Sequence, residues 1–250
     1  MLAWQVHPHY RLLLAANRDE FHARAAAPFA KWPDEEILAG RDLVAGGTWL
    51  GVDPQHRFGV VTNFREGPAT QVAAPSRGRL IADYLRSHES AQSFVAGLES
   101  SASAYAGFNL LLGDEQELWY ASNRARDFAR PLPPGVYGLS NRLLDTPWPK
   151  LTRVRHRFEA WLENAAQANA RELLAMLNDR TPSDTTDDAY PADLAPEWRR
   201  ALSAPFVLHP VYGTRCSTIV LLATNGALHV IERRFDAAGE SSGETEIELS

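Results

Sequence analysis

The strongest constraint on the fold is the hairpin signature in STIVLLATNGALHVIERRF, residues 217–235. Two apolar runs flank Asn225-Gly226, a dipeptide that readily adopts the positive φ angles of a tight hairpin turn. The stretch therefore predicts two adjacent antiparallel strands. Further apolar runs of strand length occur near residues 2–6, 11–16, 48–52, 57–63, 108–112, 117–121 and 136–140.

Helical periodicity appears between these strands. Apolar residues recur at helical spacing in residues 77–87, 91–100, 150–166 and 170–179. The resulting order is strands, helices, strands, helices and strands, with hairpin connections. This order favours an α+β fold with antiparallel sheets over a doubly wound parallel sheet. No internal repeat is visible, so we expect one domain over residues 1–250.

Two segments show neither the apolar runs of a strand nor the helical spacing of apolar residues. Residues 181–193, TPSDTTDDAYPAD, are polar, acidic and interrupted by proline, which predicts a surface loop. The polar tail at residues 237–250 is also acidic, and we expect it to be frayed.

Composition narrows the class of protein. The 31 acidic and 25 basic residues give a formal charge of -6, which argues against general electrostatic binding to nucleic acid or to an anionic membrane. The amino-terminal residues lack a basic leader region, and no apolar run approaches the roughly 20 residues of a membrane span. We therefore expect a cytoplasmic protein without a membrane span, and the sequence indicates no oligomeric state.

Metal and thiol chemistry have little support in the sequence. The single cysteine, Cys216, excludes a disulfide framework and a multi-cysteine zinc site. The histidines are scattered, His7 and His9 flank a proline, and no His-Glu-x-x-His pattern occurs. We expect no metal centre and no cofactor. Cys216 begins an apolar run, which is more typical of a small buried residue than of a nucleophile.

Polar residues follow or precede several predicted strands. A sheet could bring such strand ends together in one pocket, where Asn donates to an oxyanion and Arg binds a carboxylate or phosphate. The alternative is turn chemistry, because Asn and Asp favour turns for backbone reasons. The candidate catalytic residues at these strand ends are Arg18, Asp19, Asn63, Asn141 and Arg215.

Three further residues are candidates for substrate binding. Asn17 and Arg65 belong to the same polar strand ends, and Trp49 offers a large apolar face with one hydrogen-bond donor. Trp49 follows Gly46-Gly47, a pair that permits backbone conformations closed to other residues. A tight, buried turn remains the alternative for that stretch.

A series of collinear motifs resembles the NRDE family, which includes the eukaryotic transport and Golgi organisation proteins. The tetrapeptide NRDE occupies residues 17–20. The other matching motifs are ILAGRDLVAGGTWLGV, TNFRE, GFNLLLGD, YGLSN with LDTPWPK, and YGTRCSTIVLL. They extend over most of the chain, and such a series is far more specific than the tetrapeptide alone.

The resemblance implies a fold similar to that of N-terminal-nucleophile hydrolases, a four-layer αββα sandwich. In the related choloylglycine hydrolase and penicillin acylase branch, an amino-terminal Cys attacks a carbonyl and its own α-amine is the base. By position, Arg18 and Asp19 resemble that branch's first Arg and Asp. Asn63 and Asn141 resemble its oxyanion and amine-orienting amides, and Arg215 resembles its later Arg.

The sequence departs from this pattern at the nucleophile. Related chains commonly begin Met-Cys and a few apolar residues before the AWQ-HP segment, whereas here Met1 is followed directly by LAWQVHP. Leu2 cannot be a nucleophile. We expect that the natural start lies a few codons upstream; a trimmed chain and a lost nucleophile are the alternatives.

Two functions therefore compete. The first is a hydrolase of amide or thioester bonds whose amino-terminal Cys is missing from this sequence. The second is a non-catalytic binding or carrier protein for an anionic amphiphile, since the resemblance links eukaryotic relatives to haem trafficking and acyl-CoA metabolism. In both cases the partner is a small molecule. A purely structural role gives no reason for polar residues at strand ends.

Overall fold

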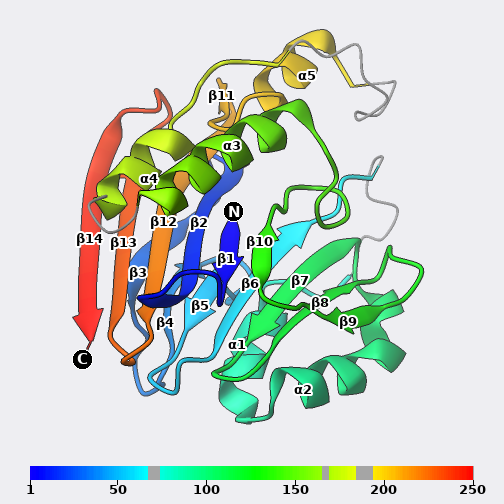
Figure 1. The fold of residues 1–250 in the computed structure, drawn as a ribbon. Coiled ribbons are helices and arrows are strands. Elements are labelled where there is room, and N and C mark those ends of the chain that lie inside the picture. The colour runs from blue at the N-terminus through cyan, green and yellow to red at the C-terminus, as the bar shows by residue number, and fades with distance from the viewer. Residues whose placement is uncertain (67–73, 165–168, 184–193, 250) are drawn as a thin grey trace. The chain divides into compact units, whose positions relative to one another are not determined.

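The computed structural model describes residues 1–66, 74–164, 169–183 and 194–249. The chain divides into two compact units, each with one antiparallel sheet and its own helices (Figure 1). Unit 1 contains the described residues of Met1–Arg24, Pro134–Gly138 and Asp145–Ser250, and unit 2 contains those of Ala25–Pro133 and Leu139–Leu144. The predicted α+β class with antiparallel sheets is confirmed. A single family domain over residues 1–250 stays a prediction.

The sheet of unit 1 has the strand order β10-β1-β2-β12-β13-β14, and β11 pairs with β12. Its strands are β1 Leu2–Trp4, β2 Tyr10–Phe21, β10 Gly135–Tyr137, β11 Leu208–His209, β12 Tyr212–Ala223, β13 Leu228–Phe235 and β14 Ser241–Leu249. The hairpin predicted around Asn225-Gly226 is confirmed as β12 and β13, and Gly226 has a φ of 92°. The long strands β2 and β12 pair along almost their full lengths.

Two helices, α3 Pro149–Glu163 and α4 Ala170–Leu177, cover one face of this sheet. A third helix, α5 Pro196–Leu202, packs beside β11 and the start of β12. Because side chains alternate between the faces of a strand, Leu13 and Ala15 of β2 share a face with Ile219 of β12. These residues form one buried cluster with Phe158 of α3 and Leu173 of α4. The apolar face of the helices thus fixes which sheet residues point toward them.

Unit 2 has the sheet order β3-β4-β5-β6-β7-β8-β9. The strands are β3 Ala26–Lys31, β4 Leu38–Asp42, β5 Leu50–Val52, β6 Phe58–Asn63, β7 Phe108–Gly113, β8 Leu118–Ser122 and β9 Ala129–Pro131. The helices are α1 Arg79–Ser87, α2 Ala91–Leu98 and the short 3-10 helix η1 Glu99–Ala104. Helix α1 packs closely on the sheet, since a Cβ at Gly59 would lie 3.0 Å from Ile81 Cγ2.

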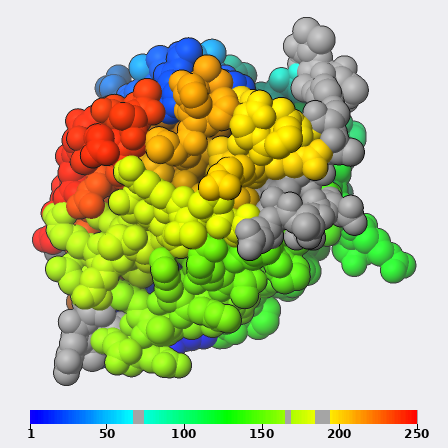
Figure 2. All heavy atoms as spheres, turned by 90° about the horizontal axis from the view of Figure 1, so that it is seen from above, coloured from blue at the N-terminus to red at the C-terminus, as the bar shows by residue number. Residues whose placement is uncertain are grey.

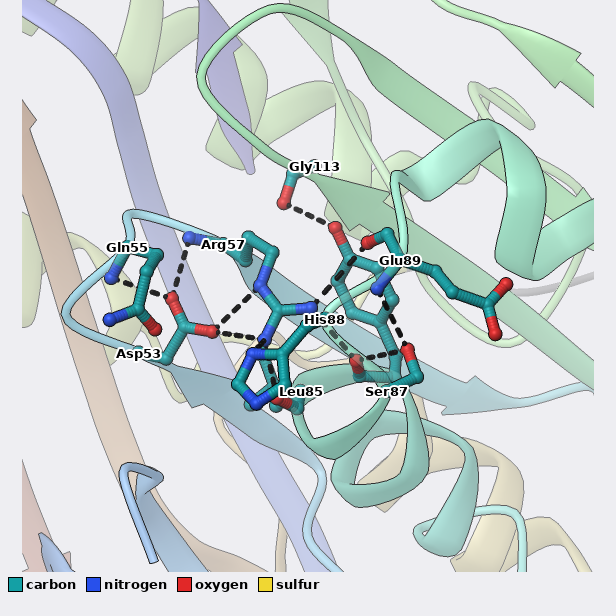
Figure 3. Close-up of polar contacts among 9 residues, drawn as sticks. Asp53, Gln55, Arg57, Leu85, Ser87, His88, Glu89 and Gly113 are labelled. Atoms are coloured by element: carbon teal, nitrogen blue, oxygen red, sulfur yellow. Dashed lines mark hydrogen bonds and ion pairs between the residues drawn. The ribbon is translucent and has the colours of Figure 1, made fainter.

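A buried ion pair within the turn between β5 and β6 positions Arg57 to bond with the end of α1 (Figure 3). Arg57 Nε donates to Asp53 Oδ2 at 2.8 Å, and both residues are almost fully buried. The same guanidinium donates to the carbonyl oxygens of Tyr84 and Leu85. Carbonyls in the last turn of a helix lack partners within the helix, so Arg57 satisfies two of them.

The carboxyl-terminal residues differ from the prediction. The expected frayed tail at 237–250 is wrong for residues 241–249, because β14 pairs with β13 from Ser241 to Leu249. The predicted acidic loop at 181–193 lies outside the described residues from 184 onward.

Among the described residues, no helix combines the length and apolar character needed to cross a bilayer.

Candidate functional site

The NRDE tetrapeptide lies inside strand β2. The predicted strand near residues 11–16, with Asn17 as its polar end, is too short, because β2 continues to Phe21 and pairs with β12 along this part. Asn17 lies opposite Ser217, Arg18 opposite Cys216 and Asp19 opposite Thr214. Alternation along a strand places Arg18 on one face of the sheet and its two neighbours on the other.

Asn17 and Asp19 are bonded within unit 1. Asn17 Nδ2 donates to the carbonyls of Leu177 and Pro205, both at 2.9 Å, and Asn17 Oδ1 accepts from Ser217 Oγ at 2.6 Å. Asp19 Oδ1 accepts from the hydroxyl of buried Thr214 at 2.7 Å. Both side chains thus join β2 to the segments beside it, and a role in substrate binding or catalysis stays a prediction.

Arg18 lies on the opposite face, where it is 9% exposed. Its Nη2 is 3.9 Å from Glu20 Oε2, and the Glu20 carboxylate is also 3.7 Å from Arg24 Nε. Glu20 thus partly balances two guanidinium groups at this end of β2. A guanidinium held in this way can attract an anion or lower the pKa of a nearby thiol.

Cys216, the cross-strand neighbour of Arg18, is a poor nucleophile. It is 4% exposed, and burial raises the pKa of its thiol far above the usual range. The Glu232 carboxylate adds to this rise and the Arg18 guanidinium opposes it. Since the thiolate is the reactive form, Cys216 stays protonated at neutral pH.

Arg215 occupies an irregular position in β12. The pairing with β2 shifts register between Thr214 and Cys216, and such a bulge re-aims the side chain of the extra residue. Arg215 Nη1 donates to the carbonyl oxygen of His22 at 2.7 Å. Within the described part of the chain, its buried Nε has no hydrogen-bond partner.

Asn141 contacts Asn63 and Arg65 in unit 2, although it lies 78 and 76 residues from them in the sequence. Asn141 Nδ2 donates to the Asn63 carbonyl at 3.0 Å. The backbone nitrogen of Arg65 donates to the Asn141 carbonyl at 2.7 Å, and Arg65 Nη2 is 3.3 Å from Asn141 Oδ1. Their proposed roles as oxyanion donors and ligand contacts stay predictions, as does one pocket formed with Arg18, Asp19 and Arg215.

Trp49 is half-buried directly before β5. A Cβ on Gly40 would lie 2.3 Å from Trp49 Cη2, so only glycine leaves room for this indole ring beside β4. Gly46, three residues earlier, has a φ of +78° and forms part of the turn that precedes Trp49. The structure therefore gives Trp49 a packing role, and its role as a ligand contact stays a prediction.

The amino terminus is a further polar group beside β2. The Met1 α-amine donates to the Ala15 carbonyl at 2.8 Å, and the Ala15 nitrogen donates to the Met1 carbonyl at 2.9 Å. Burial lowers the pKa of this amine to about 5, while the Asp145 carboxylate opposes the shift. The amine is therefore neutral at pH 7 and could accept a proton.

Sequence reasoning missed three residues near the NRDE segment. Thr214 and Ser217 bond to Asp19 and Asn17, and Glu232 lies buried next to Cys216, the cross-strand neighbour of Arg18. The signal for Glu232 was present, because a lone acidic residue in the apolar run LHVIE indicates a buried charge. The hydroxyls gave no signal of their own, because their role depends on the register between two distant strands.

Comparison with known proteins gives a consistent picture. Residues 1–237 match the family model described as Transport and Golgi organisation 2. The chain is 34% identical over 252 residues to the Transport and Golgi organization protein 2 homolog of Bos taurus, covering 94% of this chain and 91% of the bovine protein. It is 33% identical over 239 residues to the Homo sapiens homolog, covering 90% and 86%. The Drosophila melanogaster protein of that name is 30% identical over 246 residues, covering 89% and 86%.

Proposed function

This chain belongs to the Transport and Golgi organisation 2 family, and from that premise we propose that its unit 1 sheet is the scaffold of a hydrolase. The proposed enzyme cleaves amide or thioester bonds with an amino-terminal cysteine, as the resemblance to N-terminal-nucleophile hydrolases implies. The proposed four-layer αββα order follows from the same resemblance. The residues that take part in the proposed step belong to unit 1.

The register of β1 on β2 is the observation that supports the proposal. Leu2 lies opposite Leu14, and Met1 exchanges two hydrogen bonds with Ala15. Because the two strands are antiparallel, each residue added before Met1 would lie opposite the next residue of β2. The first three added residues would lie opposite Ala16, Asn17 and Arg18 in turn.

A cysteine at that point would share a sheet face with Arg18, because directly opposite residues in an antiparallel pair point to the same side. Their Cβ atoms would be about 4.5–5.5 Å apart. The guanidinium would lower the pKa of the thiol and favour the thiolate. The cysteine's α-amine would accept the thiol proton, the thiolate would attack the carbonyl carbon, and the departing amine or thiol would take up that proton. Water would then hydrolyse the acyl-cysteine, which releases the acid and restores the thiol.

The test is an extended variant that begins Met-Cys and two apolar residues before Met1, so that the cysteine falls opposite Arg18 once the initiator Met is removed. We expect turnover on a panel of N-acyl amides and acyl thioesters. The matched control adds one more apolar residue. It moves the cysteine opposite Asp19 and onto the other face of the sheet, which should abolish turnover.

Two outcomes would count against the proposal. One is a lack of turnover and of covalent labelling by an electrophilic probe in the first variant. The other is equal activity in both registers, which would mean that Arg18 has no part in activating the thiol.

A second candidate function is capture of an anionic amphiphile such as haem or acyl-CoA without catalysis. The buried Arg215 Nε, which has no hydrogen-bond partner among the described residues, favours this candidate because a guanidinium can bind a carboxylate or phosphate through two parallel bonds. Arg215→Ala should weaken binding of either ligand at least about tenfold. Arg200→Ala, a change at an exposed helix position, is the control. Titrations without saturation would exclude this candidate.

A further inference from the structure

The edge strand β14 presents three glutamates on one face. Glu244, Glu246 and Glu248 alternate with other residues, so their side chains point to the same side of the sheet. Strand β13 places His229 opposite Glu248 and Ile231 opposite Glu246. Two of these carboxylates therefore come close to one imidazole.

The distances within this group suit a small cation. One ligand atom each from His229, Glu246 and Glu248 lies within 4.8 Å of the other two. His229 Nε2 is 2.8 Å from Glu246 Oε1 and 3.8 Å from Glu248 Oε1. Donors around a tetrahedral zinc ion are about 3.3 Å apart, as ion-to-ligand distances near 2.0–2.1 Å require. Small side-chain rotations of the exposed Glu248 would close the remaining gap.

Arg171 of α4 orients one of the carboxylates from outside. Arg171 Nη2 donates to Glu246 Oε2 at 2.7 Å, which leaves Oε1 directed at His229. Figure 2 shows the surface of α4 next to that of β14. Hydrogen bonds that fix the second oxygen of a ligating carboxylate are a recurrent feature of metal sites.

Glu244 is excluded from this group by its own partners. Arg171 Nη1 donates to one oxygen of Glu244, and Arg233 Nε donates to the other at 2.9 Å. Although burial opposes the shift, these hydrogen bonds hold the pKa of Glu244 below its usual range. The face thus contains one carboxylate that two guanidinium groups neutralise and two that approach the imidazole.

The sequence pattern predicts no metal centre, but the pairing of β13 with β14 brings one histidine to two glutamates. We propose that His229, Glu246 and Glu248 bind a zinc ion, with water as the fourth ligand. One imidazole nitrogen and two carboxylate oxygens form a ligand set that zinc accepts and that Mg²⁺ and Ca²⁺, which prefer oxygen, do not favour. The ion would join the carboxyl-terminal edge strand to β13. None of its ligands belongs to the candidate hydrolase site.

The test is titration of untagged, EDTA-treated protein with zinc chloride in a calorimeter, and with magnesium and calcium chloride for comparison. We expect one zinc ion per chain, a rise in Tm with zinc, and no comparable heat from the other two ions. Glu248→Gln should weaken zinc binding at least about tenfold, and so should His229→Asn. Glu248 is 77% exposed, so its replacement leaves the fold intact, which circular dichroism would verify.

Two controls isolate the site. Glu244→Gln removes the same charge from the same strand face and should leave zinc affinity unchanged. The double variant His7→Ala/His9→Ala removes two histidines outside the proposed site, whose rings are 5.7 Å apart, and should also bind normally. The proposal is overturned if the unmodified protein binds no zinc, if Glu248→Gln binds with unchanged affinity, or if the His7/His9 variant loses binding.

Discussion

Ser217 Oγ donates a hydrogen bond of 2.6 Å to Asn17 Oδ1 across the pair formed by β12 and β2. The amide nitrogen of Asn17 faces two carbonyl oxygens, those of Leu177 and Pro205. Carbonyls can only accept, so this network defines the orientation of the amide. The Asn17 side chain therefore acts as a cross-brace: it bonds β2 to β12, to the last residue of α4 and to the segment after α5.

Replacing Asn17 with Asp tests this cross-brace. The substitution exchanges an NH₂ donor for a carboxylate oxygen that faces two carbonyls, so we expect a loss of about 2–4 kcal/mol in the free energy of unfolding. The loss should shrink in acid as the carboxylate becomes protonated and regains a donor. Urea unfolding at pH 7 and pH 4.5 would measure both effects.

Asn164→Asp is the matched control, since Asn164 is exposed and, among the described residues, its side-chain amide donates to the Ala160 carbonyl alone. Its cost should stay within about 0.5 kcal/mol. A similar cost at both positions would show that the Asn17 network does not stabilise the fold.

Arg57 provides a second test, because its loss leaves Asp53 without its partner in the interior of unit 2 (Figure 3). Asp53 is 1% exposed, and we expect Arg57→Ala to lower the free energy of unfolding by about 3–5 kcal/mol. Burial already raises the pKa of Asp53, and the hydrogen bonds and charge of Arg57 oppose that rise. Without Arg57 the pKa should rise further, so the penalty should decrease as the pH falls.

The comparison variant is Arg86→Ala. It removes an exposed ion pair between Glu35 and Arg86, which lies in the last turn of α1. We expect it to cost no more than about 1 kcal/mol. Chemical denaturation of both variants would contradict this account if their costs were equal.

The buried amino terminus makes stability depend on pH. The α-amine has a pKa of about 5 in the folded chain against 8.0 when unperturbed, so the unfolded state binds more protons between these values. Stability should therefore be fully present above pH 8 and decrease as the pH falls toward 5, by at most about 4 kcal/mol. An Nα-acetylated chain retains an N–H donor but does not titrate. Its stability should fall less over the same range, and identical pH profiles would disprove the effect.

Cys216 should resist thiol reagents in the native protein. Because burial raises the pKa of its thiol, we expect alkylation to be at least about a hundredfold slower than in the unfolded chain, which corresponds to two pKa units of thiolate. The variant Cys216→Ser/Thr224→Cys carries its thiol at the exposed hairpin turn and should react at the unfolded rate. Rapid modification of native Cys216 would contradict the assignment.

The hairpin of β12 and β13 could be predicted because its signal is local: two apolar runs and one Asn-Gly turn. The end of β2 could not be predicted in this way. Asn17 and Asp19 look like turn residues in isolation, and the hydroxyls of Ser217 and Thr214 that allow them inside a strand are 200 and 195 residues away. Polar character predicts a loop only where no distant partner satisfies it.

The same reason explains why β14 was not predicted. An acidic tail of low hydrophobicity is typical of a frayed end, yet Glu244 lies opposite Arg233, and both Glu244 and Glu246 bond to Arg171. Complementary charges on β13 and α4 thus stabilise this edge strand. By contrast, Asn141 bonds to the Asn63 and Arg65 backbone, a contact that their positions at strand ends do not specify, and the predicted roles of these residues are still untested.

The most direct test of the central claim is the thiol pKa of the extended variant whose added cysteine falls opposite Arg18. Its alkylation rate, followed against pH, should give a pKa below the usual value of about 8.5. Arg18→Met should return the pKa to that value, and Arg18→Lys should retain most of the shift. A thiol pKa that is the same with Arg18, Lys or Met at this position would contradict the account.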